Sequence, residues 1–172
     1  MPQNAKTRKG EPETSMPTPQ ELRALSHVPL LATFFRRVHG EMPEPLRETF
    51  QRHGLSARHG AVLTQLLAGE PASVSELAKR LHVSLSTASE LVGDLSRAGL
   101  VARHEDPGNR RRTLVTLAAE HRPAFESFIA VRSAPLLRAL ARLSPRDQAG
   151  FLAGLSEWAY EVQSQHTGDP DC

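Results

Sequence analysis

The chain has 172 residues, of which 39% are hydrophobic and 23% charged, which is enough apolar material for a buried core. Lysine and arginine number 21 against 19 acidic residues, so the net charge of +2 neither demands nor excludes a nucleic-acid partner. The single cysteine, Cys172, excludes an internal disulfide and a thiolate metal cage. No stretch approaches the about 20 apolar residues of a membrane span, and no secretory signal is evident, so we expect a cytoplasmic protein without membrane contacts.

The first part of the chain is predicted to contain a tail followed by helices. Residues 1–17 are rich in Pro, Glu, Lys and Thr and should form a disordered tail. A helix is predicted to start after Thr18, which can cap it. A proline follows at the first helical position, and Glu21 stands three residues after the cap. Apolar residues continue at helical spacing, and Pro29 is expected to interrupt the helix. Residues 18–53 are therefore assigned to N-terminal helices.

The middle of the chain predicts three short helices, each with its own start signal. The helices are expected to follow Ser56, Ser73 and Ser84, because serine caps a helix N-terminus well. Glu76 completes a capping box with the second of these serines, and Gly99 should end the third helix. The predicted core residues recur at the spacing of one helix face: Val62, Leu63, Leu66, Leu67, Leu77, Ala78, Leu81, Ala88, Leu91, Val92 and Leu95.

The pattern then changes from helical to strand periodicity. Residues 100–105 and 112–117 alternate in the manner of strands, and turn-forming residues separate them at 106–109. This pattern predicts a β-hairpin whose tip carries three consecutive arginines. Two short helices joined by a tight turn and followed by a hairpin are typical of a winged helix-turn-helix, which we assign to residues 54–118.

Beyond the hairpin the sequence predicts two more helices and a tail. The first helix covers residues 119–143 and contains Pro135, and the second starts after Ser144. Residues 119–165 are therefore assigned to C-terminal helices, and residues 166–172 to a flexible tail. Large apolar side chains predicted on the terminal helices are Phe34, Phe35, Phe151, Leu155, Trp158 and Val162. The expected fold class is mainly α, an α+β winged helix-turn-helix with a two- or three-stranded wing.

The helix after Ser84 and the arginine hairpin together favour binding to double-stranded DNA. Small hydroxyl side chains let the start of a helix approach a phosphate backbone, and this helix carries Ser84, Ser86, Thr87 and Ser89. Guanidinium groups on a projecting hairpin can reach the minor groove or its flanking phosphates. Taken singly, the serines can be simple caps, and the arginines can pair with Glu105 or Asp106. The order of two capped helices and a basic hairpin is what favours DNA.

The sequence also resembles the MarR family of bacterial transcription regulators over residues 55–122. The similar stretches are VSELAKRL at 74–81, SLST at 84–87, GLV at 99–101, DPGNRR at 106–111 and LVTL at 114–117. The resemblance implies a homodimer built from the N- and C-terminal helices, whose two winged domains bind a pseudo-palindromic operator. It also implies release from DNA by a small, often aromatic, effector. We predict a sequence-specific regulator of transcription that acts as a repressor.

The predicted DNA-binding residues form two groups. The group expected at the major groove is Ser84, Leu85, Ser86, Thr87, Ser89 and Glu90, and the group expected at the minor groove and phosphates is Arg110, Arg111 and Arg112. Leu85 and Glu90 stand where the family often has basic residues. We expect Leu85 to pack on a thymine methyl, and Glu90 either to accept from a cytosine amino group or to exclude wrong sequences, unless it is a solvated helix residue. Asn109 replaces a common acidic residue, and Asp106 can supply the missing brace across the turn.

Other chemistry is not predicted. The eight histidines show no i, i+4 pair and no short Cys/His spacing, so we expect no metal site, and Cys172 lacks a neighbouring cation that would activate it. No catalytic constellation or phosphate-binding glycine loop occurs, so we expect neither enzymatic activity nor a cofactor. Because the third helix of the middle segment is nearly uncharged, a winged helix that meets an acidic protein partner is the alternative. A second alternative is an architectural protein that binds DNA without sequence preference, which the small net charge disfavours.

Overall fold

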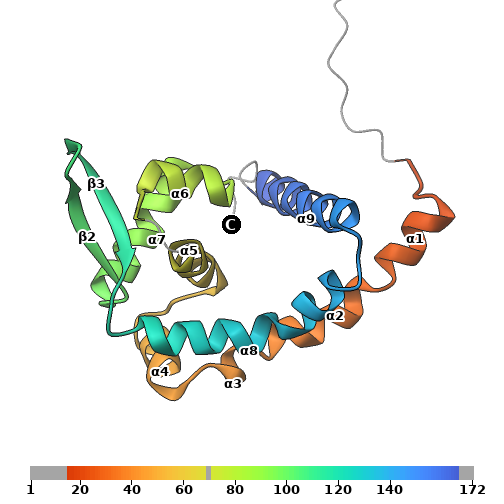
Figure 1. Cartoon of the computed structure of the whole chain (residues 1–172), viewed down its shortest axis with the longest axis horizontal. Coiled ribbons are helices and arrows are strands. Elements are labelled where there is room, and N and C mark those ends of the chain that lie inside the picture. The colour runs from red at the N-terminus through yellow and green to blue at the C-terminus, as the bar shows by residue number, and fades with distance from the viewer. Residues whose placement is uncertain (1–14, 69–70, 167–172) are drawn as a thin grey trace, which may run out of the picture. The chain divides into compact units, whose positions relative to one another are not determined.

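The computed structural model describes residues 15–68 and 71–166 of the chain (Figure 1). The chain divides into two compact units, residues 1–40 and residues 41–172. The predicted N- and C-terminal tails lie largely outside the described residues, and so does the single cysteine. Among the described residues we find no helix whose length and apolar character would let it cross a bilayer.

The first unit contains two short helices, α1 (Pro19–Leu25) and α2 (Val28–Arg36). The predicted capping box opens α1: the Glu21 backbone N–H donates to Thr18 Oγ1 over 3.3 Å, and the Thr18 N–H donates to the Glu21 carboxylate over 2.7 Å. The predicted interruption is also confirmed. Pro29 lies in the first turn of α2, where a missing N–H removes no helical hydrogen bond.

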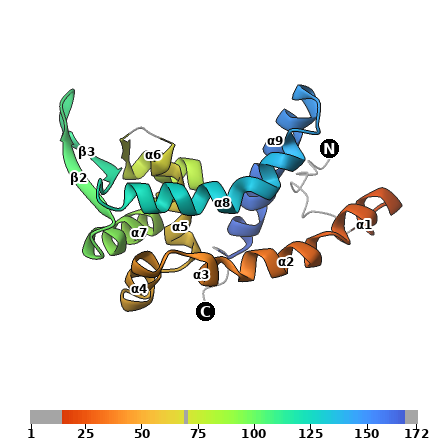
Figure 2. The ribbon, with the colours of Figure 1, turned by 60° about the horizontal axis from the view of Figure 1, so that its bottom comes forward.

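The second unit is mainly helical and carries a three-stranded antiparallel sheet, which confirms the predicted fold class. After α3 (Val38–Glu41), which spans the boundary of the units, its helices are α4 (Glu44–Arg52), α5 (Ala57–Leu67), α6 (Val74–Leu81), α7 (Leu85–Arg97), α8 (Arg122–Leu140) and α9 (Pro145–His166). Its strands are β1 (Ala72–Ser73), β2 (Val101–Asp106) and β3 (Asn109–Leu117). In Figure 2 the β2–β3 hairpin projects from one end of this unit.

The start signals predicted for the middle helices are confirmed. Ser73 and Ser84 each accept a hydrogen bond from the backbone N–H three residues later, over 3.3 and 3.0 Å. Ser56 is the N-cap of α5, and its backbone N–H donates to the imidazole of His59. Gly99 follows α7 with a φ of +72°, a left-handed conformation that suits glycine and reverses the chain into β2.

One apolar core joins the helix-turn-helix to the sheet and to α8. The predicted stripe of α7 is buried, whereas Leu67 and Leu81, also predicted as core, are half-buried. The largest side chains with almost no exposure are Leu63, Leu66, Leu77, Leu95, Leu100, Val62, Val92, Val115 and Phe125. Because these side chains come from α5, α6, α7, β3 and α8, the same core fixes α7 relative to the hairpin.

The sheet has the order β1-β3-β2, with both pairs antiparallel. Strand β1 is only two residues long, too short to produce a periodic pattern, and sequence reasoning did not predict it as a strand. It pairs Ala72 with Val115 and Ser73 with Leu114. The start of α6 is therefore hydrogen-bonded to the long strand of the hairpin, which ties the helix-turn-helix to its wing.

The two C-terminal helices are present, but the first is shorter than predicted. Helix α8 begins at Arg122 rather than at residue 119, because Pro123 sets the first turn. Pro135 lies inside α8, as predicted. Ser144 begins α9 by accepting the Asp147 backbone N–H over 3.2 Å. The apolar side chains of α9 are exposed in the single chain: Phe151, Leu152, Leu155, Trp158, Tyr160 and Val162.

Candidate nucleic-acid interface

The N-terminal turn of α7 presents a small network of hydroxyl groups. Ser84 Oγ accepts the Thr87 backbone N–H over 3.0 Å and also lies 2.8 Å from both Ser86 Oγ and Thr87 Oγ1. The capping function that sequence analysis weighed against DNA contact is thus one function of Ser84. The side chain remains exposed, so it can cap the helix and still lie beside a phosphate.

The polar face of α7 points to solvent, opposite its buried stripe. Leu85 is 60% exposed, unusually high for a large apolar side chain, and Ser86, Ser89 and Glu90 are exposed as well. Thr87 is half-buried. The structure therefore places the predicted major-groove residues on one accessible face, and an exposed leucine there offers an apolar surface to a partner.

The tip of the hairpin departs from a regular strand pair. Asp106 pairs with Asn109 and Glu105 pairs with Thr113, so the three arginines at 110–112 lie in a bulge with no register partners on β2. The sequence predicts the arginines at the tip of a simple hairpin turn, without a bulge. The bulge interrupts the regular alternation of β3, and for Arg112 the consequence is visible in its contacts.

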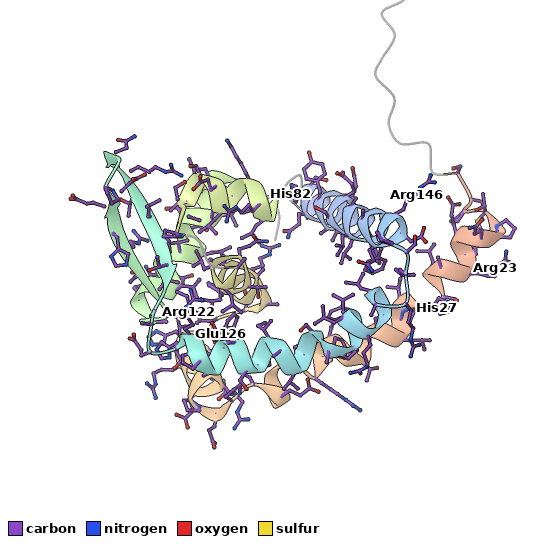
Figure 3. The ribbon with its side chains drawn as sticks, viewed as in Figure 1. Arg23, His27, His82, Arg122, Glu126 and Arg146 are labelled. Atoms are coloured by element: carbon purple, nitrogen blue, oxygen red, sulfur yellow. The ribbon has the colours of Figure 1, made fainter. Side chains whose placement is uncertain are left out.

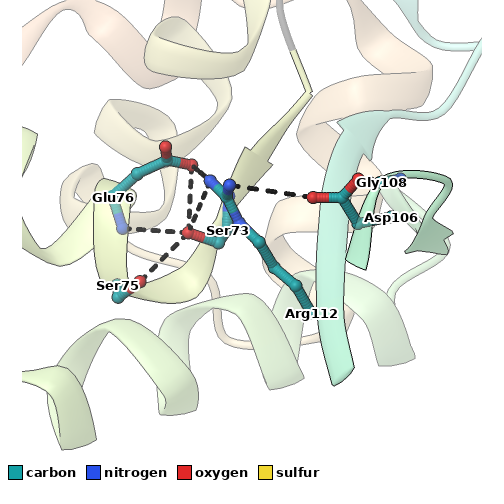
Figure 4. Close-up of polar contacts among 6 residues, drawn as sticks. All are labelled: Ser73, Ser75, Glu76, Asp106, Gly108 and Arg112. Carbon is teal, nitrogen blue, oxygen red and sulfur yellow. Dashed lines mark hydrogen bonds and ion pairs between the residues drawn. The ribbon is translucent and has the colours of Figure 1, made fainter. Parts of the chain in front are cut away.

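Arg112 does not project from the tip but turns back toward α6 (Figure 4). One guanidinium nitrogen lies 2.5 Å from a Glu76 carboxylate oxygen and 3.5 Å from Ser73 Oγ, and the other lies 3.7 Å from the Asp106 carboxylate. This arrangement matches the alternative that an arginine pairs with Asp106 and adds a partner, Glu76, that was not predicted. Arg112 therefore connects the hairpin to the first turn of α6. We call Ser73, Glu76, Asp106 and Arg112 the wing brace.

The electrostatics of the wing brace favour an ionised carboxylate. The hydrogen bond from Arg112, with further hydrogen bonds from the backbone and hydroxyl of Ser73, lowers the pKa of the Glu76 carboxyl from 4.5 to about 2. The same pair raises the pKa of Arg112. Glu76 thus has two functions, because the carboxylate that completes the capping box of α6 also binds the wing.

A second polar link, also missed by sequence analysis, fixes α7 to α5. The nearly buried imidazole of His59 lies 3.2 Å from the Asp94 carboxylate, and Asp94 also pairs with Arg97 on its own helix. His59 and Asp94 are 35 residues apart, and no local pattern connects them. The link matters because it sets the orientation of the helix that carries the exposed hydroxyl face.

The side chains of Arg110 and Arg111 are outside what the structure describes, although their backbone belongs to β3. Their contribution to an interface is therefore a prediction from the sequence. Among the described residues, no group of three or more His, Cys, Asp or Glu side chains could hold a metal ion.

Two helices joined by a tight turn, the second with an open polar face, and a hairpin tied to the first helix define a winged helix-turn-helix. The family model of the MarR family matches residues 53–112, the segment that contains the winged helix-turn-helix. This match confirms the resemblance to the MarR family that the sequence indicates.

Individual proteins are also similar to this chain. The uncharacterised HTH-type transcriptional regulator YkoM of Bacillus subtilis (strain 168) is 23% identical over 132 residues, which cover 77% of this chain and 84% of YkoM. Among solved structures, RV1404 from Mycobacterium tuberculosis has a TM-score of 0.55 at 18% identity and covers 91% of this chain and 99% of its own. A MarR family protein from Bacillus stearothermophilus has a TM-score of 0.51 at 21% identity, and the match covers 86% of this chain and 99% of that protein. These two structures share the fold.

Proposed function

We propose that this protein binds double-stranded DNA in a sequence-specific manner and represses transcription. The observation that carries the proposal is the exposed N-terminal face of α7, held by one core beside a hairpin with an arginine-rich bulge. A helix of this size fits the major groove, where each base pair presents its own pattern of donors and acceptors. The hairpin then reaches the phosphates or the minor groove next to it.

We also propose that two copies bind a pseudo-palindromic operator. The exposed apolar side chains of α8 and α9 support this step, because soluble chains seldom leave so much apolar surface without a partner. A two-fold dimer presents two identical helices to half-sites about one helical turn apart. A small aromatic effector that binds the dimer and lowers its affinity for the operator would relieve repression.

The test is a selection of random-sequence duplexes by the purified full-length protein, followed by fluorescence polarisation with the enriched duplex at two salt concentrations. We expect an inverted repeat to be enriched and its binding constant to fall as salt rises. Equal affinity for random DNA would identify an architectural binder. The absence of any binding would favour the protein–protein alternative, for which the exposed Leu85 is the strongest support. A reporter gene placed behind the enriched site then shows whether expression falls.

Leu85→Ala is expected to change the preference at one or two base positions only. The exposed side chain should contact a thymine methyl, and its loss should cost about 1 kcal/mol at those positions while other positions keep their preference. Repeating the selection with the variant measures this effect. Ser96→Ala, near the other end of α7, is the control and should leave the selected site unchanged. A variant site identical to the wild-type site at every position would contradict the assigned role of Leu85.

A further inference from the structure

The C-terminal helix contacts the turn of the helix-turn-helix through His82. Figure 3 places His82 at the end of α6, next to α9. The imidazole Nε2 lies 3.3 Å from Ser156 Oγ, and the ring meets that of Tyr160 edge to face with centroids 5.3 Å apart. Ser156 and Tyr160 are four residues apart on α9, so both face the same way.

His82 is a distinctive residue to find at this contact. It ends α6 in the left-handed conformation, with φ of 54°, and no other non-glycine residue in the described part of the chain has a positive φ. Two residues later Ser84 caps α7. The contact with α9 is therefore made at the point where the chain passes from the first helix of the motif to the second.

The end of α9 also borders the N-terminal turn of α7. A cavity of about 220 Å³ has Ser84 and Thr87 on one side and Tyr160, Gln163 and Ser164 on the other. Seating α7 in a major groove about 8.5 Å deep brings a phosphate strand alongside its first turn. The end of α9 and a bound DNA backbone would therefore occupy the same space in front of Ser84 and Thr87.

The contact is weak enough to be released. Tyr160 is 44% exposed and His82 is exposed, so water reaches both partners, and one aromatic pair with one hydrogen bond between exposed groups holds a helix only loosely. A weak contact permits a population of molecules in which α9 has left the turn, and a ligand that binds only those molecules draws the equilibrium toward them.

We propose that α9 and DNA compete for the N-terminal end of α7, and that His82 is the residue that holds α9 in the competing position. This inference rests on the proposed function, since it concerns the regulation of the same DNA-binding face. The structure is the closed state: α9 lies against the turn and limits the space in front of Ser84 and Thr87, while the side chains on the exposed face of α7 remain accessible to water. DNA binds the open state, and its measured affinity is the intrinsic affinity reduced by the fraction of molecules that are open.

The experiment compares three variants of the full chain in binding to the selected duplex. Tyr160→Ala removes the ring from the contact on the α9 side. His82→Gly removes the imidazole ring from the α6 side of the contact, and glycine tolerates the φ of 54° found at this position. Both variants are expected to bind about fivefold more tightly than wild type, because more of the molecules are open. Tyr160→Phe keeps the edge-to-face pair and should bind like wild type.

A second readout follows α9 directly. Trp158 is the single tryptophan of the chain, and it lines a cavity of about 410 Å³ with Arg58 from the first turn of α5. Its fluorescence should shift when the duplex binds wild type, and free Tyr160→Ala should already show the shifted spectrum. Equal or weaker DNA binding by both Tyr160→Ala and His82→Gly would overturn the proposal, as would a Trp158 spectrum that the duplex leaves unchanged. If wild type binds no duplex at all, the proposed function itself fails, and the competition fails with it.

Discussion

Replacing Arg110 and Arg111 together by alanine is expected to weaken binding to every duplex by on the order of tenfold per arginine at about 0.1 M salt. The backbone of the two residues lies in the bulge at the tip of the hairpin. Each phosphate contact releases condensed counterions, so losing two contacts should reduce the slope of log affinity against log salt by up to about 1.8. Polarisation titrations at four or five salt concentrations measure both quantities.

The matched control removes the same charge elsewhere. Arg138→Ala with Arg142→Ala also subtracts two positive charges, but from the end of α8 and the turn after it, where both side chains are exposed. This double variant should keep nearly the wild-type slope, because distant surface charges are screened within about 10 Å at 0.1 M salt. If the hairpin variant and the control lose affinity equally, net charge rather than the wing accounts for binding.

The features of the fold that sequence reasoning predicted correctly are local ones. Ser73 with Glu76, and Ser84 with Thr87, are three residues apart, so a capping signal can be recognised in a single stretch of chain. Gly99 belongs to the same class, because the left-handed conformation that ends α7 is a property of one residue. The buried stripe of α7 follows from helical periodicity alone.

The features that it missed depend on contacts between distant residues. Arg112 is 36 positions from Glu76, and only the pairing of β1 with β3 brings them together. The bulge at 110–112 leaves no composition signal, because the same arginines would suit a regular turn. For α9 the apolar stripe is visible in the sequence, but periodicity does not reveal whether such a stripe covers its own core or a partner. In the single chain it is exposed.

Breaking the wing brace from either side is expected to weaken DNA binding by about fivefold without changing the salt dependence. The variants are Glu76→Gln and Arg112→Met. If Arg112 holds the hairpin against α6, both variants reduce the fraction of molecules with a correctly placed wing, and affinity falls in proportion. If Arg112 instead contacts a phosphate, Arg112→Met lowers the salt slope by about 0.9. In that case Glu76→Gln leaves affinity equal or raises it, since it removes a negative charge near DNA. The change in DNA affinity caused by Glu76→Gln therefore distinguishes the two cases, because affinity falls in the first and does not fall in the second.

The pH dependence of stability gives an independent test of the same pair. Because the pKa of the Glu76 carboxyl is lowered from 4.5 to about 2 in the folded chain, its ionised form contributes stability that is complete above about pH 5. That contribution is lost as the pH falls from 4.5 toward 2, where the folded state also takes up the proton. Thermal unfolding followed by circular dichroism should show a lower melting temperature for Glu76→Gln than for wild type at pH 7. This gap between the two melting temperatures should close toward pH 2. In an Arg112→Met background the gap should be small at every pH, because the principal partner of the carboxylate is gone. A gap that stays constant from pH 7 to pH 2 would show that the carboxylate stabilises the fold by some route other than its charge.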